Sequence, residues 1–308
     1  MKEILVTCYV NPDLDGVAGA IAYCEFLKKT GRKALVGIMG EPHDEAKYIL
    51  NRFNFLHPRL ISNAADFDQV ILVDASDLKG LEGNIAPEKV IEIIDHRKIN
   101  EANEFLKAKI QIELVGSAAT LVAERFIENN ISISKESATL LCGAIISNTL
   151  NFKGSVTTER DKKAFEHLNK VALLPDNFWT ELFVAKSDLS GEKLKKRIEG
   201  DFAWFAFADK KIGIAQIEII GADKLIEERG LEIINILEEI KLEMNLDYIF
   251  QNTIELELEC NYFISPDINA QKLLETILDV KFDGFIAKRP NLIMRKQIVP
   301  LIKEELEK

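Results

Sequence analysis

The stretch ILVTCYVNPDLDG, residues 4–16, passes from an unbroken apolar run into a turn that contains two aspartates. The apolar run, residues 4–8, is typical of a strand that is buried on both faces. Residues 16–29 follow the turn and repeat their apolar side chains at helical spacing. A buried strand that leads directly into a helix indicates the first unit of a parallel sheet, with Asp13 and Asp15 in the connecting turn.

The same alternation continues through the first part of the chain. Further strands are expected at residues 34–39, 70–73 and 90–94. Further helices are expected at residues 117–128, 134–149 and 158–171, and Ser134 and Thr158 are candidate N-caps. We therefore predict an α/β fold in which a parallel sheet has helices on both faces.

A different pattern begins after the polar segment of residues 185–191, which is the best candidate for a linker. A hairpin is expected around Asp209 and Lys210, followed by a helix near residues 231–244 and strands at residues 248–250 and 253–260. This order predicts a smaller mixed α/β domain. The expected domains are residues 1–187 and 188–308.

The composition limits the classes of partner. Of the 308 residues, 47% are hydrophobic, which is enough for two buried cores, and 50 acidic residues against 39 basic ones give a net charge of −11. A surface with this charge repels nucleic acid and anionic membrane, so we expect neither as a partner. The four cysteines show no CxxC spacing, and no apolar run reaches membrane-spanning length. We expect a cytoplasmic protein with reduced thiols.

Acidic residues follow three of the expected strands. Asp13 and Asp15 follow the first, Asp74 the third, and Asp95 and His96 the fourth. Because the carboxyl ends of parallel strands lie at one edge of a sheet, these side chains should share one crevice. Crowded acids raise each other's pKa unless a cation neutralises them, and Asp with His suits Mn²⁺, Zn²⁺ or Mg²⁺. Each group alone has an ordinary explanation, as a turn residue, a cap or a surface histidine, but their coincidence predicts a metal site.

Seven motifs occur in a recognisable order: NPDLD, LVDASD, IIDHRK, ELVGSAATLVAE, GAIISNT, TTERD and RKQIVP. Together they resemble the manganese-dependent (family II) inorganic pyrophosphatases of the DHH phosphoesterase superfamily, over nearly the whole chain from residue 4 to residue 300. The segment GEPHDEAKYIL from Gly40 resembles the same family. RKQIVP resembles the signature of its second, substrate-gripping domain.

The resemblance implies a phosphohydrolase with two metal ions, which would be Mn²⁺ or else Co²⁺, Mg²⁺ or Zn²⁺. The positions that match the metal ligands are Asp13, Asp15, Asp74 and His96, with Asp74 bridging the metals. Metal-bound hydroxide would attack the phosphorus of a small phosphorylated substrate. Asp95 is expected to orient His96 through its other ring nitrogen. The implied catalytic residues are Asp13, Asp74, Asp95 and Arg97, and the implied substrate-binding residues are Arg97, Asn148, Arg295 and Lys296.

Several positions depart from the family's pattern. Tyr9 replaces a histidine, Arg97 the second histidine of Asp-His-His, Asn148 an aspartate and Met294 a lid cation, while Ala203 aligns with a further substrate-binding lysine. Fewer carboxylates and an added guanidinium leave less negative charge for two divalent ions. We therefore expect one firm metal position, held by Asp15, Asp74 and His96, and at best a weak one around Asp13.

The cationic residues have two interpretations each. Arg97 can clamp a phosphate with paired hydrogen bonds, or it can form an ion pair with Asp95 or Asp77. Arg295 and Lys296 can grip phosphate from the second domain, or they can be a solvated basic pair.

Our first hypothesis is a metal-dependent phosphohydrolase that cleaves a phosphoanhydride or phosphoester bond in pyrophosphate or a larger phosphorylated compound. The alternative is a catalytically impaired homologue that binds a phosphorylated ligand without hydrolysing it, and Tyr9, Arg97 and Asn148 are the features that would produce it. A relic that binds nothing is least favoured, because three strand-end carboxylates are costly to keep together. The number of subunits stays open, with a homodimer among the states considered.

Overall fold

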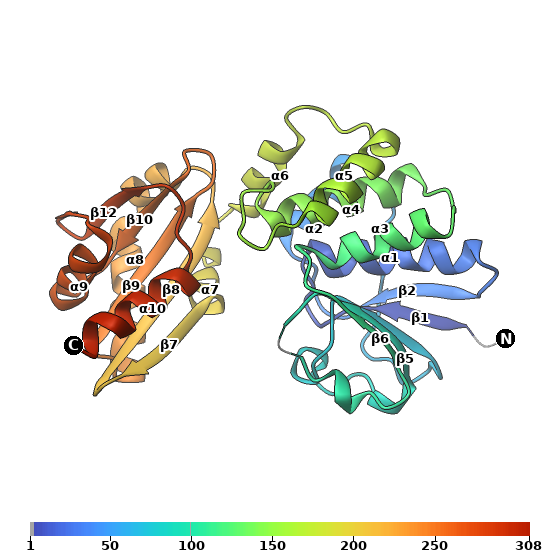
Figure 1. Cartoon of the computed structure of the whole chain (residues 1–308), viewed down its shortest axis with the longest axis horizontal. Helices are drawn as coiled ribbons and strands as arrows, with labels where there is room; N and C mark the ends of the chain where they lie inside the picture. Colours follow the sequence, from blue (N-terminus) through green and yellow to red (C-terminus); the bar gives the residue numbers. More distant parts are fainter. Residues whose placement is uncertain (1–2, 99) are drawn as a thin grey trace. The chain divides into compact units, whose positions relative to one another are not determined.

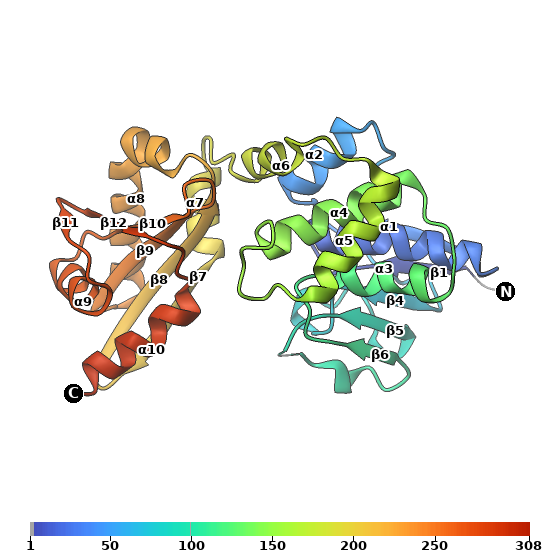
Figure 2. The ribbon, with the colours of Figure 1, turned by 45° about the horizontal axis from the view of Figure 1, so that its top comes forward.

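The computed structural model describes residues 3–98 and 100–308. The chain divides into two compact units, Met1–Lys186 and Ser187–Lys308. Each unit has its own six-stranded sheet (Figures 1 and 2). Among the described residues, every helix is too short or too polar to cross a lipid bilayer. The four cysteines are unpaired and buried.

The sheet of the first unit is parallel throughout, in the order β3-β2-β1-β4-β5-β6. Its strands are β1 (Ile4–Thr7), β2 (Ala34–Ile38), β3 (Arg59–Leu60), β4 (Val70–Val73), β5 (Val90–Asp95) and β6 (Lys109–Ile112). β1 lies at the centre, where Leu5 pairs with Leu35 on one side and Val70 on the other. This position explains why β1 and β4 consist of fully buried residues.

The helices of the first unit are α1 (Leu14–Lys29), α2 (Asp44–Arg52), α3 (Ala118–Glu128), α4 (Lys135–Thr149), α5 (Glu159–Ala172) and α6 (Phe178–Lys186). The side chains of Ser134 and Thr158 cap α4 and α5, as expected from the sequence. Ser117 caps α3 in the same way. α1 begins at Leu14, two residues earlier than expected, because Asp13 is its N-cap.

One face of the first sheet is covered by these helices. α1 packs on β1, β2 and β4, and α3 packs on β5 (Figures 1 and 2). α4 packs against α1 and α3, and α5 packs against α3 and α4. A Cβ atom on Gly19 of α1 would lie 2.5 Å from Cγ1 of Val73, so glycine is needed for the helix to approach β4 this closely.

The other face of the first sheet is covered by short 3₁₀ helices and loops. Leu72 alternates with Val73 along β4, and it packs in a buried cluster with Leu81, Ile85 and Phe105. These residues lie in or directly after the segments η1 (Lys79–Leu81), η2 (Pro87–Lys89) and η3 (Ala102–Glu104), or between them. The predicted parallel α/β fold is therefore confirmed. Its long helices cover one face only, whereas the sequence predicted helices on both, and the other face has short 3₁₀ helices and loops.

The second unit has a mixed sheet in the order β11-β12-β10-β9-β8-β7, in which only β8 and β9 are parallel. Its strands are β7 (Phe202–Phe207), β8 (Lys210–Ile219), β9 (Tyr248–Glu255), β10 (Cys260–Ile264), β11 (Phe282–Asp283) and β12 (Ile286–Pro290). Its helices are α7 (Lys193–Gly200), α8 (Ala222–Met244), α9 (Ile268–Leu278) and α10 (Arg295–Leu306). α7 and α8 contribute to one buried cluster, while α9 and α10 contribute to the other.

Two elements of the second unit differ from the prediction. The predicted strands at residues 248–250 and 253–260 are one strand, β9, followed by β10. The polar pair Gln251 and Asn252 suggested a break, but both residues are buried, and Nδ2 of Asn252 donates to the carbonyl of Ile293 at 2.9 Å. α8 begins nine residues before residue 231, and it contains Gly230 because the ring of Phe285 packs there.

Candidate metal centre

Three side chains meet at the carboxyl ends of β1, β4 and β5, which lie side by side in the sheet. Asp15, Asp74 and His96 each offer one ligand atom, and these atoms lie within 4.8 Å of one another. Nε2 of His96 is 3.4 Å from Oδ1 of Asp74 and 3.7 Å from Oδ2 of Asp15. Within residues 3–98 and 100–308, this Asp–Asp–His cluster is the one group of potential ligands with metal-binding geometry.

Asp15 is fully buried and fixed by the start of α3. Its carboxylate accepts hydrogen bonds from the hydroxyl of Ser117 and from the backbone N–H groups of Ala118 and Ala119, each at 2.8 Å. Nδ2 of Asn148, on α4, donates to Oδ2 at 2.6 Å. Burial nevertheless raises the pKa of Asp15 to about 6, and the charge of Asp13 adds to this shift while His96 opposes it. The hydrogen bonds therefore hold the carboxylate in place, but they do not offset the cost of burying its negative charge.

Asp74 is the second buried carboxylate, and its backbone is in the left-handed region with φ of 57°. Among the described residues, its Oδ1 atom has no hydrogen-bond partner, and the nearest cationic group is Nε2 of His96 at 3.4 Å. Burial raises the pKa of Asp74 well above its ordinary value, and Asp15 adds to the shift. A buried oxygen without a partner, facing an acid and an imidazole, is the environment that a bound cation would satisfy.

His96 presents one ring nitrogen to the acids. Its Nδ1 atom lies 3.0 Å from the carbonyl oxygen of Val115, which makes Nδ1 the donor and leaves Nε2 facing Asp15 and Asp74. Burial favours the neutral ring, but Asp74 and Asp15 outweigh it and raise the pKa of His96 to about 10. Without a metal, a proton on His96 therefore partly neutralises the two acids.

The structure corrects the role that the sequence suggested for Asp95. Its carboxylate does not reach the imidazole of His96, because Oδ1 accepts the backbone N–H of His96 at 2.7 Å and Oδ2 accepts the hydroxyl of Ser76. The carbonyl of Val115 takes the place at the ring that Asp95 was expected to fill. Asp95 thus holds the backbone at the end of β5.

Asp13 lies outside the Asp–Asp–His cluster among the described residues. Its Oδ1 atom caps α1 by accepting the N–H groups of Asp15 at 2.9 Å and Gly16 at 3.1 Å. The hydroxyl of Tyr9 accepts the N–H of Asp13 at 2.9 Å. Burial raises the pKa of Tyr9 far above its ordinary value, with Asp13 and Asp74 adding to the shift, so Tyr9 is a neutral phenol and a poor metal ligand.

Arg97 is engaged with protein groups in this structure. Nη1 donates to Oδ2 of Asp77 at 3.1 Å, and Nη2 donates to the backbone carbonyl of Asp74 at 3.0 Å. The guanidinium lies over the ring of Tyr9, 5.1 Å from its centre. Burial opposes the charge, but Asp74 and Asp95 keep the pKa of Arg97 above its already high ordinary value. Of the two interpretations of Arg97, the structure shows the ion pair.

The two predicted cations of the second unit begin α10 and differ in environment. The guanidinium of Arg295 donates to the backbone carbonyl of Asp201 at 2.7 Å, to its carboxylate at 2.6 Å and to the carbonyl of Ile214 at 3.1 Å. Arg295 thereby ties α10 to β7 and β8 within its own unit. Lys296 is exposed.

Two groups at the centre were missed by sequence analysis in different ways. Ser117 was assigned only to the start of a helix, although that N-cap also donates to Asp15. Val115 acts through its backbone carbonyl, for which a sequence gives no signal.

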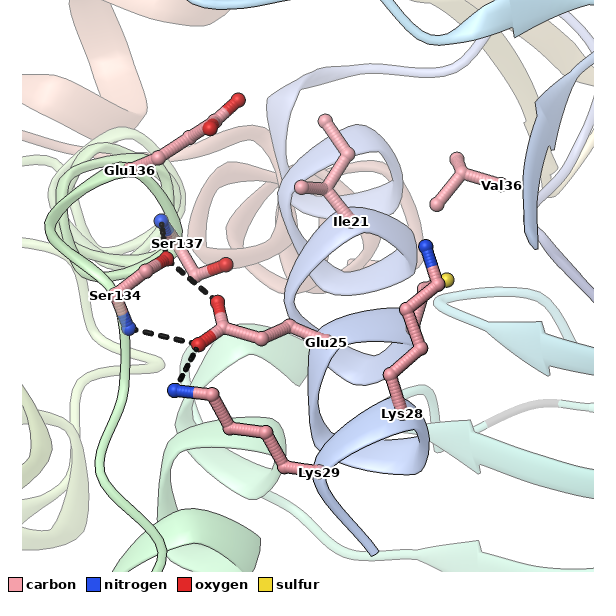
Figure 3. A pocket seen from close by; sticks show the side chains of 9 residues that line it. Ile21, Glu25, Lys28, Lys29, Val36, Ser134, Glu136 and Ser137 are labelled. Carbon is pink, nitrogen blue, oxygen red and sulfur yellow. Dashed lines mark hydrogen bonds and ion pairs between the residues drawn. The ribbon is translucent and has the colours of Figure 1, made fainter. Parts of the chain in front are cut away.

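A cavity of about 480 Å³ in the first unit lies away from these acids. It is lined by the later turns of α1, from Ile21 to Lys29, and by the start of α4, whereas Asp15 lies in the first turn of α1. Figure 3 shows Glu25 in this cavity, where its carboxylate binds Ser134 and Lys29. Glu25 is thus hydrogen-bonded to Ser134 and paired with Lys29. Among the described residues, this cavity contains no group of metal ligands like the Asp–Asp–His cluster.

The donors of the Asp–Asp–His cluster fit a divalent metal ion. Two carboxylate oxygens and one imidazole nitrogen suit Mn²⁺, Co²⁺ and Zn²⁺, and the oxygens also suit Mg²⁺. The unpartnered Oδ1 atom of Asp74 is the specific sign that a ligand belongs there.

Comparison with known proteins supports this interpretation. Residues 3–145 match the DHH family, N-terminal domain, and residues 180–305 match the DHHA2 domain. The manganese-dependent inorganic pyrophosphatase of Methanothrix thermoacetophila is 31% identical over 99% of both chains. A Bacillus cereus protein named "probable manganese-dependent inorganic pyrophosphatase" is 32% identical over the whole of both chains.

A solved structure agrees with these sequence matches. The crystal structure of a Methanococcus jannaschii protein, described as a "putative family II inorganic pyrophosphatase", superposes with a TM-score of 0.68 and 28% identity, covering 99% of this chain and 100% of that one. These sequence and structural similarities cover both units of the chain and are not limited to a short motif. The chain therefore belongs to the family of the manganese-dependent inorganic pyrophosphatases, with a DHH domain followed by a DHHA2 domain.

Proposed function

We propose that this chain is a metal-dependent phosphohydrolase that cleaves a phosphoanhydride or phosphoester bond, with inorganic pyrophosphate as the first substrate to test. The observation that carries the proposal is the unpartnered buried oxygen of Asp74 within the Asp–Asp–His cluster. The names of the full-length relatives supply the reaction class.

Asp15, Asp74 and His96 would hold the metal ion. The ion would supply a water of lowered pKa and positive charge next to the phosphate. Asp15 is oriented by the start of α3, and His96 by the carbonyl of Val115, so both ligands are in position before the metal binds. We propose one firmly held ion, since Asp13 already caps α1 with Oδ1.

The substrate would be a small phosphorylated compound. Lys296 is exposed at the start of α10, and we propose it as the cation that contacts phosphate from the DHHA2 domain. Arg295 supports that position by binding Asp201 and Ile214. Because Arg295 is bound to protein groups, Lys296 alone would attract the phosphate. A single lysine attracts phosphate less strongly than an Arg–Lys pair, which suits a substrate of lower charge density than pyrophosphate.

A second candidate function is phosphate-ligand binding without turnover. The observation that favours it is the engagement of Arg97 and Asn148 with protein acids, which leaves fewer groups to activate and orient substrate.

Phosphate release decides between the two candidates. The metal-free protein is loaded with Mn²⁺, Co²⁺, Mg²⁺ or Zn²⁺ and assayed with pyrophosphate, tripolyphosphate, nucleotides and sugar phosphates. We expect release with Mn²⁺ or Co²⁺. Asp74→Ala should reduce it by more than about 100-fold, the upper end for losing a group that merely orients a ligand.

The matched control is Asp66→Ala, which removes an exposed carboxylate and should leave the rate unchanged. The second candidate would be established instead if no compound released phosphate and calorimetry showed saturable binding of one of them.

A further inference from the structure

We propose that Arg97 is a resident cation in the place that a second divalent ion would take, so that the chain binds one divalent ion rather than two. The inference rests on the proposed metal site. In it, the positive charge of Arg97 is the reason that the site would hold one ion.

The guanidinium of Arg97 lies among three carboxylates. Its nitrogens are 3.1 Å from Oδ2 of Asp77, 3.6 Å from Oδ2 of Asp74 and 3.9 Å from Oδ1 of Asp95. The three carboxylates contact three different nitrogens of the guanidinium, which thereby takes up negative charge that a second divalent ion would need. The ring of Tyr9 lies against the guanidinium.

The two carboxylate oxygens of Asp74 have different partners. Oδ1 lies beside His96 and belongs to the Asp–Asp–His cluster, whereas Oδ2 lies beside Arg97. When a carboxylate bridges two metal ions through both of its oxygens, each oxygen binds one of the ions. Because the guanidinium occupies the side of Oδ2, a second ion on Asp74 would have to displace it.

Charge also disfavours a second ion. Asp15, Asp74 and Asp95 are each at most 2% exposed. Arg97 already places one positive charge on the Oδ2 side of Asp74. A second divalent ion beside the guanidinium would meet the repulsion of a like charge, which is strong at a site that is largely shielded from water.

The contacts of Arg97 also disfavour its transfer to a phosphate. Its side chain donates to the backbone carbonyl of Asp74 and to the carboxylate of Asp77, so leaving would strip both acceptors of their partner. Asp74 is buried, so its carbonyl would lose a donor that water does not readily replace. The site therefore retains the guanidinium and takes up one ion beside it.

Metal counting tests the inference without any substrate. The metal-free full-length protein is titrated with Mn²⁺, and bound metal is counted by calorimetry and by the electron paramagnetic resonance signal of free Mn²⁺. The wild type should bind one ion per chain. Arg97→Gln keeps the size but removes the charge, and it should bind a second ion, whereas Arg97→Lys keeps the charge and should stay at one.

The matched control is Arg52→Gln, which removes an exposed arginine paired with Glu181 and should leave the count at one. Circular dichroism checks that each variant folds. If Arg97→Gln does not fold, the positions of anomalous Mn²⁺ peaks in wild-type crystals decide. One peak between Asp15, Asp74 and His96, with Arg97 still beside Asp77, supports the inference.

Two ions per wild-type chain, or one ion in a folded Arg97→Gln variant, would overturn the inference. These results are separable from failure of the proposed function. A chain that binds two ions and releases phosphate overturns only the role of Arg97, and a chain that binds one ion and releases none overturns only the hydrolase. A wild-type chain that binds no ion overturns both.

Discussion

The carboxylate of Asp15 has several hydrogen-bond donors around it, but its pKa is still raised. It accepts four hydrogen bonds, from Ser117, Ala118, Ala119 and Asn148. Hydrogen bonds to the charged form lower a carboxyl pKa, yet that of Asp15 is raised to about 6, because burial outweighs them. Neutral donors fix the direction of this side chain but do not replace a cation.

The role of Asn148 as a positioning residue can be measured. Asn148→Ala removes the donor 2.6 Å from Oδ2 of Asp15 while sparing the three metal ligands. The dissociation constant for Mn²⁺, measured by calorimetry, should rise by about 10–100-fold, the usual effect of losing a group that orients a ligand. Asn103→Ala, at an exposed site, is the control and should change nothing. Equal affinity in the wild type and Asn148→Ala would show that α3 alone positions Asp15.

At this scale the sequence predicted which residues approach one another but not all of their contacts. Asp15, Asp74 and His96 meet as expected, because each directly follows a central parallel strand or starts the helix after it. The difference between Asp13 and Asp15 depends on one helical turn, which aims the first at backbone N–H groups and the second at α3. Side-chain direction within a turn is set by tertiary contacts that a sequence pattern does not contain.

The first turn of α1 is held by carboxylates at each of its leading N–H groups. Asp13 accepts from two of them, and Glu45 accepts the N–H of Leu14 at 3.3 Å. Glu45 is buried on α2, and it also accepts the hydroxyl of Ser147 at 2.6 Å and lies 3.5 Å from Nζ of Lys186. One side chain therefore connects α2 with the start of α1 and the ends of α4 and α6.

The charge of Glu45 should appear in the acid dependence of stability. Burial alone would raise its pKa, but Lys186, Ser147 and the N–H of Leu14 together lower it. The folded state then binds this proton less readily than the unfolded state, whose pKa is about 4.3. The stabilisation is complete above that pH and is lost as the pH falls through the lower folded value.

We expect Glu45→Gln to lower the free energy of unfolding by about 2–3 kcal/mol near pH 7, less than for a fully buried pair because Lys186 is 16% exposed. Urea denaturation from pH 7 to pH 3 should show this difference shrinking below about pH 4. Glu128→Gln, on the exposed end of α3, should show no such trend. A difference that stayed constant down to pH 3 would mean that packing, not charge, explains the loss.

Element prediction succeeded where burial and capping coincide. α3, α4 and α5 begin directly after the Ser or Thr that caps them, and β4 matches the expected residues 70–73. β3 and β6 were not predicted, because they are short edge strands with exposed or half-buried residues. Edge strands form through pairing with a neighbour and lack the apolar run that marks a central strand.

The candidate metal ligands and the candidate phosphate-binding residues lie in different units of the chain. Asp15, Asp74 and His96 all lie in the unit Met1–Lys186, while Arg295 and Lys296 lie in Ser187–Lys308. Each unit has buried apolar clusters of its own. The first unit therefore contains what metal binding requires.

A fragment of residues 1–186 should bind Mn²⁺ with a dissociation constant within about threefold of the full chain, since every ligand and orienting group is present. Phosphate release should be lost, because the fragment lacks the cations of α10. Calorimetry on the fragment, with its Asp74→Ala variant as the control, measures the first expectation. A folded fragment with affinity reduced more than tenfold would show that the second unit takes part in metal binding.

The two-unit organisation was visible in the sequence as a change of pattern after a polar segment, and its second sheet was the less predictable one. Mixed sheets depend on pairings between distant strands, such as β8 with β9, and Gln251 and Asn252 obscured the continuous strand. The side chain of Asn252 bonds to residues of other segments, Asn261 and Ile293, which a local sequence pattern does not reveal.

The left-handed backbone conformation of Asp74 lowers the thermal stability that this fold could otherwise reach. The conformation costs a non-glycine residue about 1 kcal/mol or more, although aspartate and asparagine adopt it more readily than most. Asp74→Asn keeps this backbone preference and removes a buried carboxylate, so the metal-free variant should melt a few degrees above the wild type in calorimetry while losing Mn²⁺ uptake. A lower melting temperature would show that the carboxylate of Asp74 gains more from Arg97 than it loses by burial. Under the proposed function, the residue that lowers the thermal stability of the metal-free chain is the one that would hold the ion.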